Sequence, residues 1–413
     1  MIQKGFISAY TTAIACLILC SPSRAQDIEF GGSVSAEVRY FSNGPQFVGQ
    51  FETFQPSIAL SPEIRWKSAN GGSQVVASPF FRADSQDSAR THADLREAYY
   101  RFRSDEDWTL TIGAAHVFWG KTESRHLVDV VNQVDGVEDI DEEDRLGQPM
   151  VNLALNKAWG QLDLYFMSGF RLRTFPGRRG RLRLELPVDN DAPVFNRSGN
   201  RAAPDFAARY AHHVGPVDLG ISIFHGTSRE PRFLIEPAQG RLRPVYDLMT
   251  QGGLEAQYTT GAWLWKAEAI VRKTNDQTFF ASVSGFEYTL FGVASSGLDL
   301  GFIGEYQHDG RDETIIVSNL GMITPTPVTP FGNAFFAGAR LAFNDMKEST
   351  LLIGATTDVG DGSTLAIAEF QRRIKTDWHV ELEARIFTGV DPSNLLDSLR
   401  SDDFVSFKLT RHF

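Results

Sequence analysis

The stretch DDFVSFKLTRHF, residues 402–413, decides the fold. Read with a period of two, its apolar side chains share one face: Val405, Phe407, Leu409 and Phe413. The side chains between them are polar: Ser406, Lys408, Thr410 and His412. An apolar stripe on an exposed edge strand promotes aggregation, so soluble proteins avoid it. A strand that closes a barrel within a bilayer has no such edge, and we expect residues 403–413 to be one.

These residues resemble the C-terminal signature of Gram-negative outer-membrane β-barrels, in which the membrane-insertion machinery recognises a terminal Phe preceded by alternating apolar residues. The resemblance implies that Phe407, Leu409 and Phe413 act as an insertion signal. It also implies three partners, namely outer-membrane lipid, lipopolysaccharide and the barrel-assembly machinery. We therefore expect the protein in a Gram-negative outer membrane.

The N-terminus predicts the same export route. Lys4 precedes the mostly apolar residues 7–19, and Ser23-Arg24-Ala25 is a small-x-small cleavage site, so residues 1–25 are predicted to be a cleaved secretory signal peptide. A lipoprotein signal ending at Cys20 is the less favoured interpretation, because Leu19 is not a small residue.

Composition excludes several classes of protein. The formal net charge of −11 argues against nucleic-acid binding. Both cysteines, Cys16 and Cys20, lie in the predicted signal, so we expect no disulfide and no cysteine metal site afterwards. Residues 26–413 contain no apolar run of about 18 residues, which excludes transmembrane helices but leaves room for shorter transmembrane strands.

Alternating segments recur along the whole chain. Connections between them are short and long in strict alternation, and residues 118–149, 169–203, 228–251 and 308–332 are the long external loops. We predict an all-β fold, a transmembrane antiparallel up-and-down β-barrel of about eighteen strands over residues 26–413 with periplasmic termini. Residues 171–175 and 179–186 also alternate and leave open a further strand pair or an external hairpin. The predicted strands are residues 28–41, 53–67, 73–84, 93–103, 107–117, 150–157, 159–168, 204–212, 217–227, 252–259, 262–273, 278–290, 298–307, 333–343, 349–358, 363–373, 378–387 and 403–413.

The polar face of these strands carries both signs of charge and is predicted to line the lumen. Mixed charge fits a water-filled channel or a salt-bridged plug, and the sequence does not distinguish them. The predicted lumen residues are Glu37, Arg39, Glu63, Arg65, Arg82, Arg209, Glu255, Lys266, Glu268, Arg272, Glu305, Arg340, Glu381, Glu383, Arg385 and Lys408.

The loop at residues 118–149 has an apolar part and an acidic part. Leu127, Val128, Val130 and Val131 are unexpected in a solvated loop, so we predict that this part folds inward and packs inside the barrel. The acidic part lacks the ligand spacing of a calcium loop, and a solvated acidic loop is the favoured interpretation, without a metal site. Its acids are predicted to select solutes at a constriction: Asp129, Asp135, Glu138, Asp139, Asp141, Glu142 and Glu143.

The next long loop is rich in arginine. Arginines at every second position share one side of an extended ribbon, where their forked donors suit anionic groups. We weigh a ladder for an anionic solute or half of a field across the pore against contact with lipopolysaccharide phosphates, and leave these open. The residues are Arg171, Arg173, Arg179, Arg181 and Arg183.

Enzyme signatures are missing from the sequence. Residues 115–122, AHVFWGKT, approach a phosphate-binding loop but lack its first Gly and its strand-to-helix setting. A nucleophile elbow, a His-Glu-x-x-His pair and a clustered triad are also missing. We predict no catalytic residue, no cofactor and no enzymatic activity.

Several motifs exceed generic barrel patterning: VFWGKTE at 117–123, VDVVNQ at 128–133, SGFEYTL at 284–290, LDLG at 298–301, EYQHDGR at 305–311, RLAFND at 340–345 and ELEAR at 381–385. They resemble a family of uncharacterised proteobacterial outer-membrane proteins of porin-like architecture, which implies fold and location but no particular solute. A more distant resemblance is to the eighteen-stranded alginate exporter. Here acids balance the arginines, which argues against a polyanionic solute.

These observations predict a channel for passive or facilitated diffusion of small hydrophilic, possibly charged solutes. The loop at residues 118–149 would set the size limit, and its acids opposite the arginines at 171–183 would select by charge. The alternative is a non-conducting structural, adhesion or assembly barrel whose external loops bind a partner.

Overall fold

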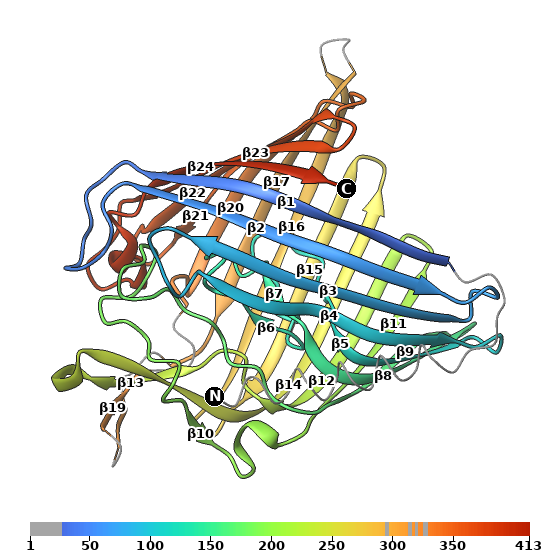
Figure 1. The fold of residues 1–413 in the computed structure, drawn as a ribbon, viewed down its shortest axis with the longest axis horizontal. Helices are drawn as coiled ribbons and strands as arrows, with labels where there is room; N and C mark the ends of the chain where they lie inside the picture. Colours follow the sequence, from blue (N-terminus) through green and yellow to red (C-terminus); the bar gives the residue numbers. More distant parts are fainter. Residues whose placement is uncertain (1–26, 294–296, 313–315, 319–320, 325–328) are drawn as a thin grey trace.

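The computed structural model describes residues 27–293, 297–312, 316–318, 321–324 and 329–413. The predicted signal peptide at residues 1–25 lies outside the described residues. Within them, eighteen antiparallel strands form a closed barrel (Figure 1), so the predicted fold class is confirmed. The barrel strands are β1 (Asp27–Phe41), β2 (Phe54–Lys67), β3 (Ser73–Asp84), β4 (His92–Arg103), β5 (Trp108–Ala115), β8 (Gln148–Lys157), β9 (Gly160–Met167), β11 (Asp205–Val214), β12 (Val217–Thr227), β14 (Arg241–Thr260), β15 (Trp263–Lys273), β16 (Thr278–Val293), β17 (Leu298–Asp309), β20 (Asn333–Ala342), β21 (Thr350–Asp358), β22 (Thr364–Lys375), β23 (Trp378–Thr388) and β24 (Phe404–His412).

The barrel closes where β1 meets β24. The antiparallel register aligns Phe41 with Phe404 and Ala36 with Leu409. Beyond this pairing, the Gly32 and Phe413 backbones exchange two hydrogen bonds of 3.1 and 3.0 Å. Because β24 also pairs with β23, and β1 with β2, neither strand presents an open edge. The predicted seam is therefore confirmed.

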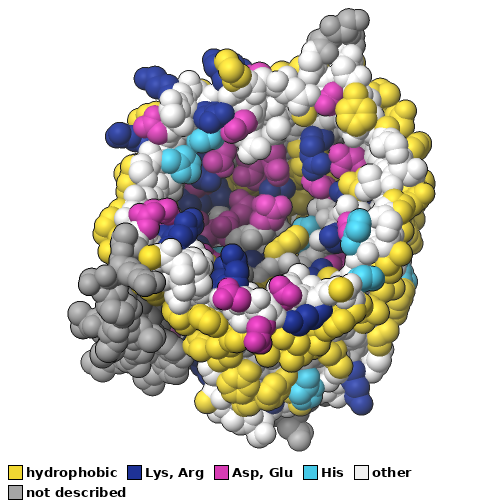
Figure 2. Space-filling model, turned by 90° about the vertical axis from the view of Figure 1, so that its right-hand side faces the viewer, with side chains coloured by type: hydrophobic (Ala, Val, Ile, Leu, Met, Phe, Trp, Pro, Cys, Tyr) yellow, Lys and Arg dark blue, Asp and Glu magenta, His cyan; other side chains and the backbone are white. Residues whose placement is uncertain are grey.

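Side chains alternate between the two faces of the barrel. On β24, Val405 and Phe407 point outward and are 50% and 41% exposed, whereas Ser406 and Thr410 point inward and are buried. Figure 2 shows the same division for the molecule, with a hydrophobic outer surface around an opening walled by Lys, Arg, Asp and Glu. Period-two patterning in the sequence thus becomes an apolar exterior and a charged lumen.

Connections alternate in length between the two ends of the barrel. Residues 68–72, 104–107, 158–159, 215–216, 261–262, 343–349 and 376–377 make tight connections at one end. The long ones at the other end include residues 116–147 and 389–403. Figure 2 looks into the end with the short turns. No helix among the described residues is long and apolar enough to cross a membrane.

The long loops contain more strand than expected. β14 begins at Arg241, whereas the sequence pattern predicts a strand from residue 252. Pro244 interrupts that pattern, but in the structure it lies in a part of β14 that extends past the barrel rim. β13 (Arg232–Glu236) and β10 (Val194–Asn196) pair with this extension, and β19 (Gly321–Ile323) joins β13 to β18 (Ile316–Ser318). Figure 1 shows this outer sheet beyond the barrel wall at lower left.

The further strand pair left open at residues 171–175 and 179–186 does not form. In the described residues this segment contributes only an isolated bridge between Thr174 and Asp135. Its backbone is irregular because its side chains bind separate parts of the rim, such as Asp94, Gln86 and Asp402.

Gly113 on β5 lies where the backbones of β4 and β5 approach each other closely. Its φ is +135°, and a Cβ atom there would lie 2.2 Å from the Ala98 carbonyl oxygen. We expect Gly113→Ala to lower the free energy of unfolding in detergent by about 2 kcal/mol or more. Urea titration followed by heat-modifiable gel mobility measures this. Gly252→Ala on β14 is the matched control, since nothing lies within 4 Å of its Cβ position, and an equal loss in both variants would contradict the explanation.

Candidate functional site

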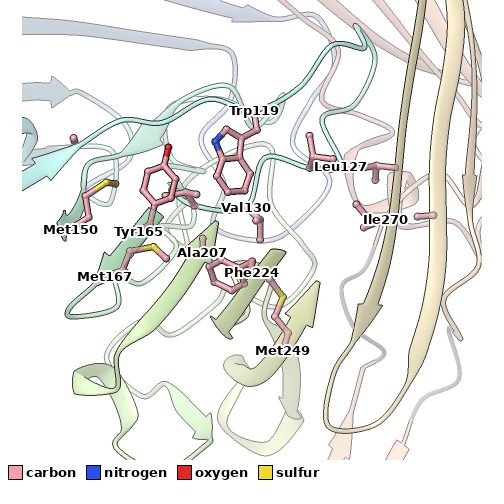
Figure 3. Packing of buried hydrophobic residues seen from close by; sticks show 14 of the residues in the cluster. Trp119, Leu127, Val130, Met150, Tyr165, Met167, Ala207, Phe224, Met249 and Ile270 are labelled. Atoms are coloured by element: carbon pink, nitrogen blue, oxygen red, sulfur yellow. The ribbon is translucent and has the colours of Figure 1, made fainter. Parts of the chain in front are cut away.

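Residues 116–147, which we call the infolded loop, connect β5 to β8 and lie inside the barrel. The apolar loop residues Leu127, Val128, Val130 and Val131 are all at most 5% exposed. The inward packing predicted for this part is confirmed. Figure 3 shows Trp119, Leu127 and Val130 of the loop beside the wall. The wall side of this cluster consists of Val76, Tyr99, Ala115, Met150, Tyr165, Met167, Ala207, Phe224, Met249, Ile270, Phe279, Ala281 and Val283.

This apolar contact has a clear driving force. Full burial of a Val or Leu side chain contributes roughly 1.5–3 kcal/mol, and the wall residues would otherwise face a watery lumen. The inner face of β3 to β5 and of β8 to β16 is therefore apolar where it contacts the loop. Some strands have apolar side chains on both faces, such as β12 with Ile223 outside and Phe224 inside. In the sequence, this pattern indicates that another segment covers the inner face.

Two carboxylates of the wall hold the loop backbone. Glu268 on β15 accepts hydrogen bonds from the backbone N–H groups of Lys121 and Thr122 at 2.7 and 3.1 Å, and from the Thr122 hydroxyl at 2.7 Å. Glu305 on β17 accepts from the backbone N–H groups of Glu123 and Ser124, both at 2.8 Å. Both glutamates are at most 2% exposed. These two predicted lumen residues anchor the loop and are covered by it.

The acidic part of the loop docks on arginines of the opposite wall. The prediction of a solvated acidic loop is wrong for Asp135, Glu138 and Asp139, which are at most 9% exposed. The physical reason is that guanidinium groups of β1, β3 and β4 compensate their desolvation. The ion pairs are Asp139 with Arg39 at 2.7 Å, Glu138 with Arg82 at 2.7 Å and Asp135 with Arg96 at 2.7 Å.

Asp141, Glu142 and Glu143 remain open to the lumen. Asp141 lies 3.0 Å from Arg385 on β23, and Glu142 lies 2.7 Å from Arg173. Desolvation within the lumen, reinforced by the charge of Asp139 and opposed by Arg385, raises the pKa of Asp141 to about 8. Asp129 differs because it is buried beside Arg145 at 3.2 Å, and burial raises its pKa to about 6.

The predicted arginine ribbon does not form. Arg171 pairs with Asp94, Arg173 pairs with Glu142, and Arg179 donates to the Gln86 side chain at 3.1 Å. Arg181 is buried against Asp402 at 2.6 Å and also donates to carbonyl groups of Glu52 and Ser401. Arg183 is buried and donates to the carbonyl groups of Leu184 and Glu185.

These arginines therefore tie loops together. Arg181 joins the segment after β9 to the segments before β2 and before β24, at the rim near the barrel seam. Arg173 does face an acid of the infolded loop, Glu142, whereas Arg171 and Arg181 pair with acids of other segments. Charge selection between the two loops stays a prediction. The wall supplies most of the cations that face the acids.

The remaining predicted lumen residues lie on the inner face. Lys266 is 3.6 Å from Glu123 and 3.5 Å from Glu287, and Arg340 pairs with both glutamates. Arg272 lies 3.0 Å from Glu230. Towards the short turns, the partly exposed pairs are Arg65 with Glu63 at 2.8 Å and Lys408 with Glu381 at 2.9 Å, and Arg385 also pairs with Glu383 at 2.6 Å.

The sequence pattern does not single out Arg90, which is central to the docking of the loop. It lies in the connection between β3 and β4, yet its side chain enters the barrel. There it contacts Glu37 at 3.0 Å and Asp84 at 3.1 Å, and it donates to the Val137 carbonyl oxygen at 3.1 Å. A lone arginine in a connection gives no periodic signal, so only the folded chain reveals this role.

A cavity of about 440 Å³ lies between the infolded loop and the barrel wall. The loop contributes Asp139 to Glu143 on one side. The wall contributes Phe336, Leu352, Ile367, Glu369 and Arg385 on the other side. Phe331, Leu396 and Leu399 lie on the side of the long connections, and Glu123 belongs to the cluster with Arg340 and Lys266.

No family model and no curated protein matches this sequence. Solved structures do match. OpdQ of Pseudomonas aeruginosa is 11% identical with a TM-score of 0.54, covering 95% of this chain and 99% of that chain. The outer membrane channel DcaP of Acinetobacter baumannii is 10% identical with a TM-score of 0.45, covering 95% and 99%. OprB of Pseudomonas putida is 10% identical with a TM-score of 0.45, covering 94% of each chain. The likeness to OpdQ supports the barrel fold.

Glu268 offers a direct test of how the loop is held. Glu268→Ala leaves the backbone N–H groups of Lys121, Thr122 and Val128 without the carboxylate that accepts from them, which costs at least about 3 kcal/mol. We expect the loop to become cleavable by added protease within residues 118–149 while the barrel keeps its heat-modifiable mobility. Glu63→Ala is the control, because Glu63 contacts Arg65 near the mouth. Equal protection in both variants would contradict the anchoring role.

Proposed function

We propose that this protein is an outer-membrane channel for the diffusion of small hydrophilic solutes, with a preference for cations. The observation that supports this proposal most directly is the cavity between the infolded loop and the wall of the barrel. The fold, the outer surface and the charges of this cavity each support one part of the proposal.

Membrane insertion is supported by the closed hydrogen bonding and the apolar exterior. In hydrocarbon every backbone polar group needs a partner within the protein, and a closed barrel supplies it. Outward side chains such as Ile58, Ile221 and Phe335 are 57–60% exposed. Water would disfavour so many exposed apolar groups, whereas lipid would accommodate them.

Passage of a solute is supported by the position of the cavity. It is bordered by Leu396 on the side of the long connections and by Glu123 deeper in the barrel. Glu123 pairs with Arg340, whose side chain is one-third exposed. The inner face continues from there to the hollow mouth in Figure 2. A volume of about 440 Å³ is within the range of small-molecule sites.

The cation preference follows from which charged groups reach the cavity. The side chains of Glu142 and Glu369 are 46% and 42% exposed, and that of Asp141 is 25% exposed. The arginines that line the same cavity are less exposed, from 4% for Arg272 and 6% for Arg385 to 18% for Arg173 and 21% for Arg125. The most exposed charged groups of the cavity are therefore carboxylates, which favour the passage of cations.

Planar-bilayer recording of the purified protein tests the channel directly. We expect discrete conductance steps and, in a KCl gradient, a reversal potential of the sign that indicates K⁺ preference. Liposome swelling with sugars of graded size then gives the size limit. A barrel with intact heat-modifiable mobility that is silent in both assays would overturn the proposal and favour the non-conducting barrel whose loops bind a partner.

Asp141 gives this proposal a pH dependence. Its raised pKa of about 8 means that the carboxylate is charged at pH 9 and neutral at pH 6. We expect the K⁺ to Cl⁻ permeability ratio to fall roughly two- to fourfold from pH 9 to pH 6, and Asp141→Asn to remove most of that change. Glu348→Gln, in a turn outside the lumen, is the control. An unchanged pH profile in Asp141→Asn would rule out this role for Asp141.

A further inference from the structure

We propose that His92, Asp135 and Glu138 bind a divalent transition-metal ion, Zn²⁺ foremost, that fixes the acidic part of the infolded loop to the barrel wall. His92 opens β4, and both carboxylates belong to the loop. One possible ligand atom from each residue lies within 4.8 Å of the other two. The proposal does not depend on whether the barrel conducts solutes.

The spacing of these atoms matches metal ligands better than hydrogen-bond partners. His92 Nε2 lies 3.4 Å from Asp135 Oδ2 and 3.6 Å from Glu138 Oε1. Two ligands on a tetrahedral Zn²⁺ with bonds of about 2.1 Å stand roughly 3.4 Å apart. A hydrogen bond from imidazole to a carboxylate would be about 2.7–3.2 Å long.

Unpartnered atoms point into the same space. Glu138 is 4% exposed, and its Oε1 has no hydrogen-bond partner in the described residues, nor has His92 Nε2. The other oxygen of Glu138 is held by Arg82 at 2.7 Å, which leaves Oε1 facing the histidine. A buried carboxylate oxygen without a donor is costly, and a bound cation would compensate it.

The histidine is oriented as a metal ligand. Its Nδ1 lies 3.0 Å from the Arg90 carbonyl oxygen, a distance at which Nδ1–H donates to that carbonyl. In the neutral tautomer that makes this bond, Nε2 carries the lone pair and faces the carboxylates; from the imidazolium form, Zn²⁺ would displace the Nε2 proton. A backbone carbonyl that fixes the second ring nitrogen is the usual support of a metal-bound histidine.

One imidazole and two carboxylates define the class of ion. This donor set with one position left for water suits Zn²⁺, whereas Ca²⁺ requires six to eight oxygen ligands. Arg96 opposes binding, because its guanidinium lies 2.7 Å from Asp135 Oδ2 and repels a cation there. The site is therefore expected to bind more weakly than one without a neighbouring cation.

Titration of the chelator-treated full chain in detergent with ZnCl₂ tests the proposal by calorimetry. The variants are made in a His379→Gln background, because the His379 and His412 rings are 5.0 Å apart and offer a surface site. We expect one Zn²⁺ per chain, loss of binding of at least tenfold in His92→Gln and Glu138→Gln, and tighter binding in Arg96→Gln. His308→Gln, at a half-buried histidine elsewhere, is the matched control and should bind normally.

A second measurement tests the proposal even if the His92 and Glu138 variants do not fold, because it needs neither of them. The zinc K-edge absorption spectrum of the His379→Gln protein should show one imidazole nitrogen and carboxylate oxygens at about 2.0–2.2 Å. Absence of Zn²⁺ binding, wild-type affinity in both His92→Gln and Glu138→Gln, or a first shell without imidazole would each overturn the proposal. Such results would leave His92 as a polar neighbour of the two acids only.

Discussion

The whole structure depends on the hydrogen-bonded seam between β1 and β24. This pairing removes both edges of the sheet and gives every strand an inside and an outside. Once the barrel is closed, an apolar side chain on the inner face cannot reach lipid. It has to be covered by another part of the chain, and the infolded loop with Val128 and Val131 provides that cover.

The inner wall therefore has two different halves. From β8 to β17 it presents apolar side chains together with the carboxylates of Glu268 and Glu305, which accept hydrogen bonds from N–H groups of the loop. On β1 and β3 it presents arginines, which pair with the acids of the same loop. The sequence of the loop, apolar first and acidic afterwards, matches these halves. The cavity remains between the acidic part of the loop and the inner face of β20 to β23.

Much of the fold was predictable because a strand with one lipid-facing side has a local signature. The period of two in residues 403–413 predicts the closing strand. The apolar residues Val128 and Val131 predict that their part of the loop is buried away from water. The charged partners were not predictable, because ion pairs form between segments far apart in the chain. Arg181 illustrates this, since its alternation with Arg179 and Arg183 suggested a ribbon, whereas its partner Asp402 is in another loop. Likewise, the burial of Glu138 depends on Arg82 and cannot be inferred from an acidic run alone.

The inward position of the loop is tested most directly by a disulfide between Val128→Cys and Gly253→Cys. A Cβ atom at Gly253 would lie 3.7 Å from the Val128 Cβ atom, which suits a disulfide. Ser222→Ala makes room, because the Ser222 hydroxyl lies 2.5 Å from that Cβ position, and Cys16 and Cys20 are replaced by Ser. The disulfide should form fully in the folded barrel under mild oxidation, as seen by peptide mapping. A folded barrel in which both thiols stay reduced would contradict the infolded position of residues 116–147.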